Sequence, residues 1–346
     1  MNTKLTKRGT YVDEQGGEYS ADGKTLYHFR QASSDMKVYR VQEGCEVIGR
    51  MAFKNSNLSE ILLPNSVAII RDQALFGCSQ LRRMNIPRSL TVFEMEHYPF
   101  PSSFSDLYEE SAHYRNRDGI LFNSDMSELL LCYKDRETVE VPQTVKRVAP
   151  QAFANRLGMK EIILPDGLET IGDAAFMGCT SLTTLTIPHT VTAVGRRLCW
   201  GCHSLQTVDL SNGIKDIPQF AFFSCNLRAV SLPDGIKKIG EHAFGANFSL
   251  MSVFMPNSVR SIGMSAFEKC ESLEDIHLPE RLNTIDISTF CGCKALRSIE
   301  IPTSVQRIKS RAFCGIRDLK INIKKGQTII ISDDAFNSED CLTIID

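Results

Sequence analysis

The chain has 346 residues, with 39 Lys and Arg against 41 Asp and Glu and a formal net charge of −2. This balance lacks the basic excess of a nucleic-acid-binding protein, so we expect no nucleic-acid partner. No apolar run approaches the roughly 18 residues needed to cross a bilayer, so we expect no membrane span.

Two features bear on the compartment. Residues 1–10 are positively charged, but no apolar segment follows them, so they are not a signal peptide as they stand. The chain has twelve cysteines, and unpaired thiols are a liability in a secreted protein. Both features favour a cytoplasmic protein.

Residues 1–38 are polar and rich in turn-forming residues. Within them, residues 18–20 and 25–29 alternate like two short strands, and Asp22-Gly23 between them is a strong hairpin-turn signal. The end coil of a repeat protein would otherwise expose its core to water. We therefore interpret this hairpin as an N-terminal cap.

A repeated pattern begins at Val41 and is clearest between Leu182 and Phe267. Each unit reads Leu-x-x-Leu-x-Leu-Pro, then Val-x-x-Ile-Gly, Ala-Phe and Gly-Cys, at a spacing of 23 residues with one spacing of 22. A fixed period of this length indicates a solenoid. We predict a first repeat block at 39–93 and a second at 139–346, whose tail pairs as a terminal strand.

Between the blocks, residues 94–138 are predicted to hold an insertion and an internal hairpin. The pattern is lost over 94–117, where residues 105–114 can form a short helix with Ser105 as its N-cap. Residues 118–122 and 127–133 then alternate like a second hairpin. All these segments belong to one continuous solenoid domain.

The spacing within a unit explains why the chain coils. The last two leucines of Leu-x-x-Leu-x-Leu face one side of a strand, and stacked strands form a parallel sheet at about 4.8 Å spacing. Proline ends the strand, because it has no N–H to donate. We predict an α/β-type repeat solenoid, a right-handed coil with a parallel concave β-sheet and short strand or 3₁₀ turns on the other side.

The Leu-x-x-Leu-x-Leu unit with its Pro, Ile-Gly, Ala-Phe and Gly-Cys positions resembles the BspA-type leucine-rich repeat of bacterial proteins. The resemblance covers roughly residues 39–93 and 118–345. It implies a curved solenoid that binds other macromolecules and has no catalytic residues. Because members of this family often carry export signals and surface anchors, it also implies a secreted or cell-surface location as the alternative to the cytoplasm.

The cysteines and histidines are candidates for chemistry. Cys199 and Cys202 have the C-x-x-C spacing of redox and metal sites. However, they fall in the phenylalanine and cysteine columns of the repeat, so we interpret them as packing residues. Cys291 and Cys314 are equivalent in adjacent units and within disulfide range, where we favour free thiols over a bond. The histidines lack metal-ligand spacing, and we expect no metal, cofactor or catalytic residue.

The positions that the core leaves free are better candidates for a site. The third and fifth residues of each Leu-x-x-Leu-x-Leu face away from the core. Phe254 is an aromatic in a fifth-residue column that is mostly polar, like an anchor with a polar rim; the alternative is an ordinary exposed apolar residue. The predicted partner-binding residues of this column and its neighbour are Ser231, Phe254, Asp275, His277 and Glu300.

The insertion is the second candidate surface. Departures from a repeat often carry its function, and this one concentrates aromatic residues. The alternative is a packed excursion that covers the gap after residue 93. The predicted partner-binding residues here are Tyr98, Phe100, Phe104 and Tyr108.

We therefore predict a non-enzymatic scaffold that binds a protein, such as a host or surface ligand, through the concave face and the insertion. A rigid repeat lowers the ordering cost of binding. A glycan is the less favoured ligand, and the chain is expected to be a monomer or weakly self-associating. The alternative function is a structural or self-assembly module of a larger surface or intracellular complex.

Overall fold

The computed structural model describes residues 4–5, 9–94, 103–109, 111–336 and 342–345. The chain divides into two compact units. The first comprises Met1–Asp135 and Ala149–Phe153, and the second comprises Arg136–Val148 and Ala154–Asp346.

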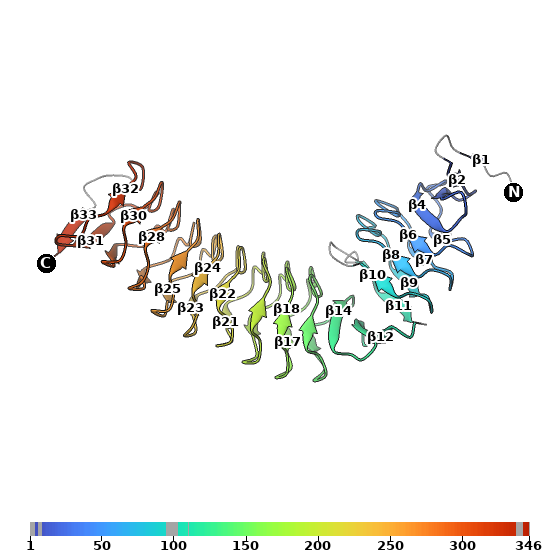
Figure 1. Cartoon of the computed structure of the whole chain (residues 1–346), viewed down its shortest axis with the longest axis horizontal. Coiled ribbons are helices and arrows are strands. Elements are labelled where there is room, and N and C mark those ends of the chain that lie inside the picture. Colours follow the sequence, from blue (N-terminus) through green and yellow to red (C-terminus); the bar gives the residue numbers. More distant parts are fainter. Residues whose placement is uncertain (1–3, 6–8, 95–102, 110, 337–341, 346) are drawn as a thin grey trace. The chain divides into compact units, whose positions relative to one another are not determined.

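In each unit the chain winds as stacked coils, and each coil is one sequence repeat (Figure 1). A coil contributes one strand from Leu-x-x-Leu-x-Leu, a two-residue strand from Val-x-x-Ile, and a turn that carries Ala-Phe. Equivalent strands pair in parallel, as Thr184 pairs with Thr207 and Ser231 with Phe254. The sequence period is therefore the advance from one coil to the next.

The described residues of the first unit contain fourteen strands. They are β1 (Lys4–Leu5), β2 (Tyr11–Val12), β3 (Gly17–Tyr19), β4 (Thr25–Phe29), β5 (Val38–Arg40), β6 (Val47–Ile48), β7 (Glu60–Leu62), β8 (Ile69–Ile70), β9 (Arg83–Ile86), β10 (Val92–Phe93), β11 (Asp106–Glu109), β12 (Tyr114–Arg117), β13 (Ile120–Asn123) and β14 (Glu128–Cys132). They form one sheet in the order β1-β2-β3-β4-β6-β8-β10, a second in the order β11-β9-β7-β5, and the set β12-β13-β14.

The second unit repeats the same two kinds of strand. The Leu-x-x-Leu-x-Leu strands are β15 (Thr138–Glu140), β17 (Glu161–Ile163), β19 (Thr184–Thr186), β21 (Thr207–Asp209), β23 (Ala229–Ser231), β25 (Ser252–Phe254), β27 (Asp275–Ile276), β29 (Ser298–Ile301), β31 (Lys320–Lys324) and β33 (Leu342–Ile345). The short strands are β16 (Arg147–Val148), β18 (Thr170–Ile171), β20 (Ala193–Val194), β22 (Asp216–Ile217), β24 (Lys238–Ile239), β26 (Ser261–Ile262), β28 (Thr284–Ile285), β30 (Arg307–Ile308) and β32 (Ile330–Ile331). The predicted terminal strand is present as β33, which pairs in parallel with β31.

The predicted N-terminal hairpin is present and covers the first coil. Strands β3 and β4 pair antiparallel, and β4 pairs in parallel with β6 of the first coil. Tyr19 and Tyr39 are fully buried there, with their hydroxyl oxygens 2.8 Å apart, and Tyr39 donates to Asp13 at 2.6 Å. Burial raises the pKa of both tyrosines, so they stay neutral and serve as hydrogen-bonding core residues.

The short helix predicted at 105–114 is wrong. Strand β11 lies there instead and pairs in parallel with β9, so that Asp106 lies beside Arg83. Phe104 and Leu107 are both buried, at the positions that Leu81 and Met84 hold one coil earlier. The period of 23 residues thus continues through this segment, although the complete Leu-x-x-Leu-x-Leu motif is not kept there. The second hairpin is present, since β13 and β14 pair antiparallel.

The core of the second unit is built around a stack of phenylalanine rings. Phe222, Phe244, Phe267, Phe290 and Phe313 are fully buried, one from each of five successive coils. Neighbouring ring centroids lie 5.5 to 5.7 Å apart, and the planes differ by 5 to 13°. The same turns are joined by backbone bonds, such as that from Phe244 N–H to Ala266 O at 2.9 Å. Core packing and backbone pairing therefore follow the same period.

The cysteine column ties each coil to the one before it. Buried thiols of Cys202, Cys270 and Cys293 donate to the carbonyls of Phe176, Phe244 and Phe267 at 3.0 to 3.3 Å. Burial raises the pKa of Cys270 to about 12 and that of Cys293 well above its usual value, so these two thiols stay protonated. All three act as packing residues.

One prediction about the cysteines is wrong. Cys291 and Cys314 form a disulfide between adjacent coils, with Cα atoms 4.6 Å apart, instead of two free thiols. Both stand in the turn, where neighbouring coils bring equivalent residues within bonding range.

The parallel solenoid is confirmed, but the α/β description is not. The residues that the structure describes contain no helix, and the segments between strands are turns. The turn that carries Ala-Phe contains non-glycine residues in the left-handed region, among them Arg197, Phe220 and His242 with φ of 52 to 57°. A right-handed helix needs negative φ, so it cannot continue through these residues.

Candidate binding surface

The strand face of the second unit presents one large exposed aromatic. This face is the outer side of β23, β25, β27 and β29, and Phe254 ends β25 with 64% of its surface exposed. Val253 beside it is buried, because successive side chains of a strand point to opposite faces. Ser231 of β23 is its exposed register partner. The structure thus places Phe254 outward, as predicted.

The next coils add a polar hollow of about 270 Å³. The predicted residues Asp275, His277 and Glu300 all line it, whereas Ser231 and Phe254 lie outside its lining. Three further polar residues of its lining were not predicted, namely Glu280, Ser298 and Asn322. Asn322 pairs in register with Glu300, so extending the fifth-residue column by one coil would have found it.

Charges on this face are exposed and loosely paired. His277 Nδ1 lies 3.5 Å from Asp275 Oδ1, with side chains 87% and 70% exposed, and Lys324 Nζ lies 3.9 Å from Glu300 Oε1. Exposed pairs of this kind contribute about 0–1 kcal/mol to stability. Their side chains can therefore turn to a partner at little cost to the fold.

The residues predicted in the insertion fare differently. Phe104 is 2% exposed and packs edge-on against Tyr133 at a centroid distance of 5.6 Å, so its assignment to a partner surface is wrong. It stands 23 residues after Leu81, in the column that fills the core. Tyr108 lies in β11, and Tyr98 and Phe100 lie outside the described residues, so these three stay predictions.

The C-x-x-C pair has no exposed thiol. Cys199 and Cys202 are both 0% exposed. Burial, followed by the hydrogen bond with Cys202, raises the pKa of Cys199 well above its usual value. A thiolate is therefore strongly disfavoured at the position where redox chemistry or metal binding would need one.

The residues that the structure describes contain no group of three or more His, Cys, Asp or Glu placed to hold a metal ion. Nor does any helix of bilayer-crossing length and apolarity occur in them.

Comparison with solved structures supports the same fold. A leucine-rich repeat protein from Eubacterium ventriosum is 21% identical, with a TM-score of 0.62 over 81% of this chain and 89% of that one. One from Bacteroides ovatus is 20% identical over 100% of this chain and 98% of that one, with a TM-score of 0.47. A leucine-rich cell surface protein from Faecalibacterium prausnitzii is 22% identical over 99% and 94%, with a TM-score of 0.42.

The comparison with curated proteins gave no significant match. The family model for the BspA type leucine rich repeat region (6 copies) matches residues 26–130, 124–250 and 242–346. Repeat proteins of this kind are generally protein-interaction scaffolds and are typically non-enzymatic. With nearly its whole length matched by that model and its coils stacked at the same period, this chain belongs to the BspA-type leucine-rich repeat family.

Proposed function

We propose that this protein is a non-enzymatic scaffold whose strand face binds a protein partner, with Phe254 as the apolar anchor. The observation that carries the proposal is the exposure of this ring, 64%, on a strand that is fixed by neighbours on both sides. Large aromatic residues at the centre of an interface supply much of its binding energy. Here the anchor needs no rearrangement of the backbone to be presented.

The polar hollow beside the anchor supplies the rim. Asp275, His277 and Glu300 offer hydrogen-bond donors and acceptors one and two coils away from Phe254. Since adjacent strands are about 4.8 Å apart, anchor and hollow fall within roughly 10 Å, a small part of a standard interface. Such a surface suits a partner that buries an apolar group next to a polar or basic segment.

The test compares two exposed residues of the same column. Parent protein, Phe254→Ala and Ile163→Ala are immobilised and exposed to the same extract of host and bacterial surface proteins. Ile163 is the matched control, because it is 47% exposed at the equivalent position of β17. We expect at least one protein to be retained by the parent and by Ile163→Ala but reduced about 10-fold or more on Phe254→Ala.

If the parent protein and both variants retain the same proteins in the same amounts, Phe254 is not the anchor. The same variants distinguish the self-assembly alternative. If the parent gains mass with concentration in light scattering and Phe254→Ala does not, the partner is another copy of this chain.

A further inference from the structure

Within the described residues of the second unit, the sheet of short strands is interrupted at two places. The short strands form the sets β16-β18-β20, β22-β24-β26 and β28-β30-β32, so β20 does not pair with β22, nor β26 with β28. At the first of these breaks the long strands of the two coils remain paired, as β19 is with β21. The coils are therefore at their normal spacing, and the break is local to this edge.

Pro218 stands at the break between β20 and β22. In several other coils the residue after Val-x-x-Ile donates its N–H to the previous coil, as Gly240 does to Ile217 O at 2.8 Å and Gly263 to Ile239 O at 2.9 Å. The bond does not need glycine, since Lys309 donates it to Ile285 O at 3.0 Å. Pro218 occupies this column and has no N–H, so the ladder loses a bond at this coil.

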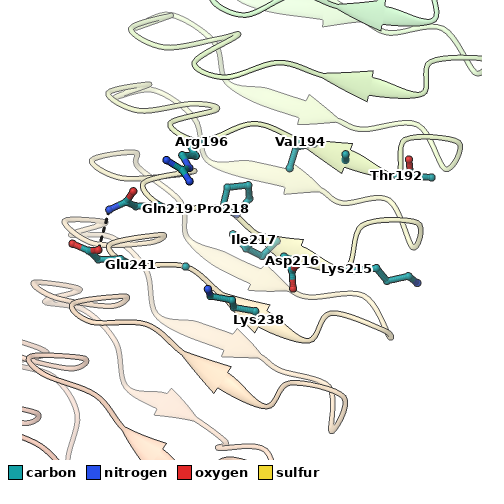
Figure 2. Close-up of a pocket in the computed structure, with 12 residues that line it drawn as sticks. Thr192, Val194, Arg196, Lys215, Asp216, Ile217, Pro218, Gln219, Lys238 and Glu241 are labelled. Atoms are coloured by element: carbon teal, nitrogen blue, oxygen red, sulfur yellow. Dashed lines mark hydrogen bonds between the residues drawn. The ribbon is translucent and has the colours of Figure 1, made fainter.

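A hollow of about 460 Å³ lies over the break and spans three coils. Val194 and Pro218 form a partly exposed apolar floor between the two sets of strands, whereas the Ile217 side chain is fully buried (Figure 2). Arg196, Gln219 and Glu241 follow one another along one side, while Lys238 lies next to its register partner Asp216 (Figure 2). A cavity of this size is within the usual range for a small organic ligand.

The two cationic side chains Arg196 and Lys238 are available to pair with a ligand. In the part of the chain that the structure describes, the Arg196 and Lys238 side chains make no hydrogen bond or ion pair. Arg196 lies two coils before Lys238 and three residues beyond the column of that lysine, and both residues line the hollow with long side chains. Between them, Gln219 Nε2 donates to Glu241 Oε2 at 2.9 Å, which aligns an amide and a carboxylate.

The turn beside these residues is held by a stack of flat groups. The rings of Phe220 and His242 are parallel, 6° apart in angle with centroids 4.7 Å apart, and the Arg197 guanidinium lies 5.2 Å from the Trp200 ring centroid. Arg197, Phe220 and His242 each directly follow a residue that lines the hollow. The stack therefore limits the movement of Arg196, Gln219 and Glu241 and reduces what a ligand must order.

We propose that this hollow, the seam pocket, binds an acidic sugar. The carboxylate pairs with Arg196 and Lys238, the hydroxyls exchange hydrogen bonds with Gln219 and Glu241, and the C–H face of the ring packs on Pro218. Two cations alone would suit any small anion. The apolar floor and the amide–carboxylate pair favour a ligand with both a C–H face and hydroxyl groups. The seam pocket shares no residue with the strand-face site, so either proposal can fail without the other.

The test uses the full chain with sodium glucuronate, glucose and inorganic phosphate as probes. In saturation-transfer NMR we expect the ring protons of glucuronate to receive magnetisation and those of glucose to receive at least 10-fold less. Trp200, which is the single tryptophan, is 37% exposed beside the pocket and should report saturable glucuronate binding by fluorescence. Phosphate should not displace glucuronate at equal concentration.

Variants locate the site. Arg196→Ala and Lys238→Ala should each weaken glucuronate binding about 10-fold, whereas Arg307→Ala, in the Lys238 column but outside the pocket, should not. Pro218→Gly returns an N–H to the ladder and should abolish binding by narrowing the pocket. The proposal is overturned if the parent does not bind glucuronate, if phosphate displaces it, or if Arg307→Ala weakens it as much as Lys238→Ala. Arg196 and Lys238 are exposed, so their variants fold even if Pro218→Gly does not.

Discussion

Asn247 shows how one residue can replace another in a repeat without breaking it. It stands in the cysteine column and is fully buried. Its Nδ2 donates to Phe222 O at 2.8 Å and to Phe244 O at 2.7 Å, and its Oδ1 accepts from Leu227 N–H at 3.2 Å. The amide thus makes the thiol's bond to the previous coil and two more. The preceding coil, from Leu205 to the next leucine Leu227, is shortened to 22 residues.

At this position we predict a graded loss of stability. Asn247→Ala removes three hydrogen bonds to buried backbone groups, although Phe244 O keeps the Cys270 thiol as a donor, and should lower the free energy of unfolding by about 2–4 kcal/mol. Asn247→Cys can still donate to Phe222 O, as the other column thiols do, and should lose about half as much. Urea unfolding monitored by circular dichroism measures both, with the exposed Asn257→Ala as control, expected within about 0.5 kcal/mol of the parent. Equal values for the three variants would contradict the role given to this amide.

Residue-scale prediction from sequence succeeded where the repeat defines a column. The outward position of Phe254 and the packing role of Cys202 follow from register alone, because period and strand alternation decide which way a side chain points. Register does not decide chemistry between coils. Cys291 and Cys314 were recognised as neighbours, but whether two neighbouring thiols bond depends on side-chain geometry that spacing does not contain.

At the scale of an element, a phenylalanine is buried in the phenylalanine stack but exposed on the strand face. Phe267 lies between the rings of Phe244 and Phe290, at 5.5 and 5.7 Å, whereas Phe254 of the same repeat projects into solvent. The first is fixed by neighbouring rings, and the second is fixed only by its strand.

We predict that Phe267→Ala lowers the free energy of unfolding by about 3–5 kcal/mol, the usual cost of emptying a buried aromatic site. Phe254→Ala, the matched control, should change it by less than about 1 kcal/mol. Chemical denaturation of the two variants under the same conditions makes the comparison. Similar losses for both would mean that Phe254 is part of the core.

Secondary structure is harder to predict where the residues of the repeat motif are replaced but its spacing continues. Residues 103–109 keep only Leu107 of the three leucines of the repeat, with Phe104 and Glu109 at the other two positions, and their polar residues suggest a helix N-cap. Tertiary pairing with β9 decides the outcome, because Phe104 and Leu107 fill the core columns one period on. The seam pocket was missed for a related reason. Its signal is one proline in a column of donors, which matters only once that column is known to carry a bond.

On the scale of the whole second unit, stability is expected to be a sum over coils and their interfaces. Deleting Ala229–Met251 removes one period and joins Arg228 to Ser252, the register partner of Ala229. Phe222 would then meet Phe267, and the Cys270 thiol would face Phe222 O. We predict a folded protein with an unchanged strand signal per residue and a modestly lower thermal midpoint, measured by circular dichroism.

The control for this deletion removes residues 229–239 alone. This leaves one coil with about half of its residues, too few to close, so the coils before and after it lose register with each other. It should yield a poorly folded or aggregated product. If both deletions behave alike, the coils are not interchangeable units.

The link between Cys291 and Cys314 has a mechanical consequence. If the second unit is pulled from its ends, its coils lie in series, and each coil that detaches lengthens the chain by about 80 Å, since a period of 23 residues extends at about 3.5 Å per residue. The disulfide closes a loop over one such period, so that coil cannot lengthen. Extension would therefore stop short by one coil's length at the C-terminal part of the unit, which gives a tethered scaffold a non-extending segment close to its end.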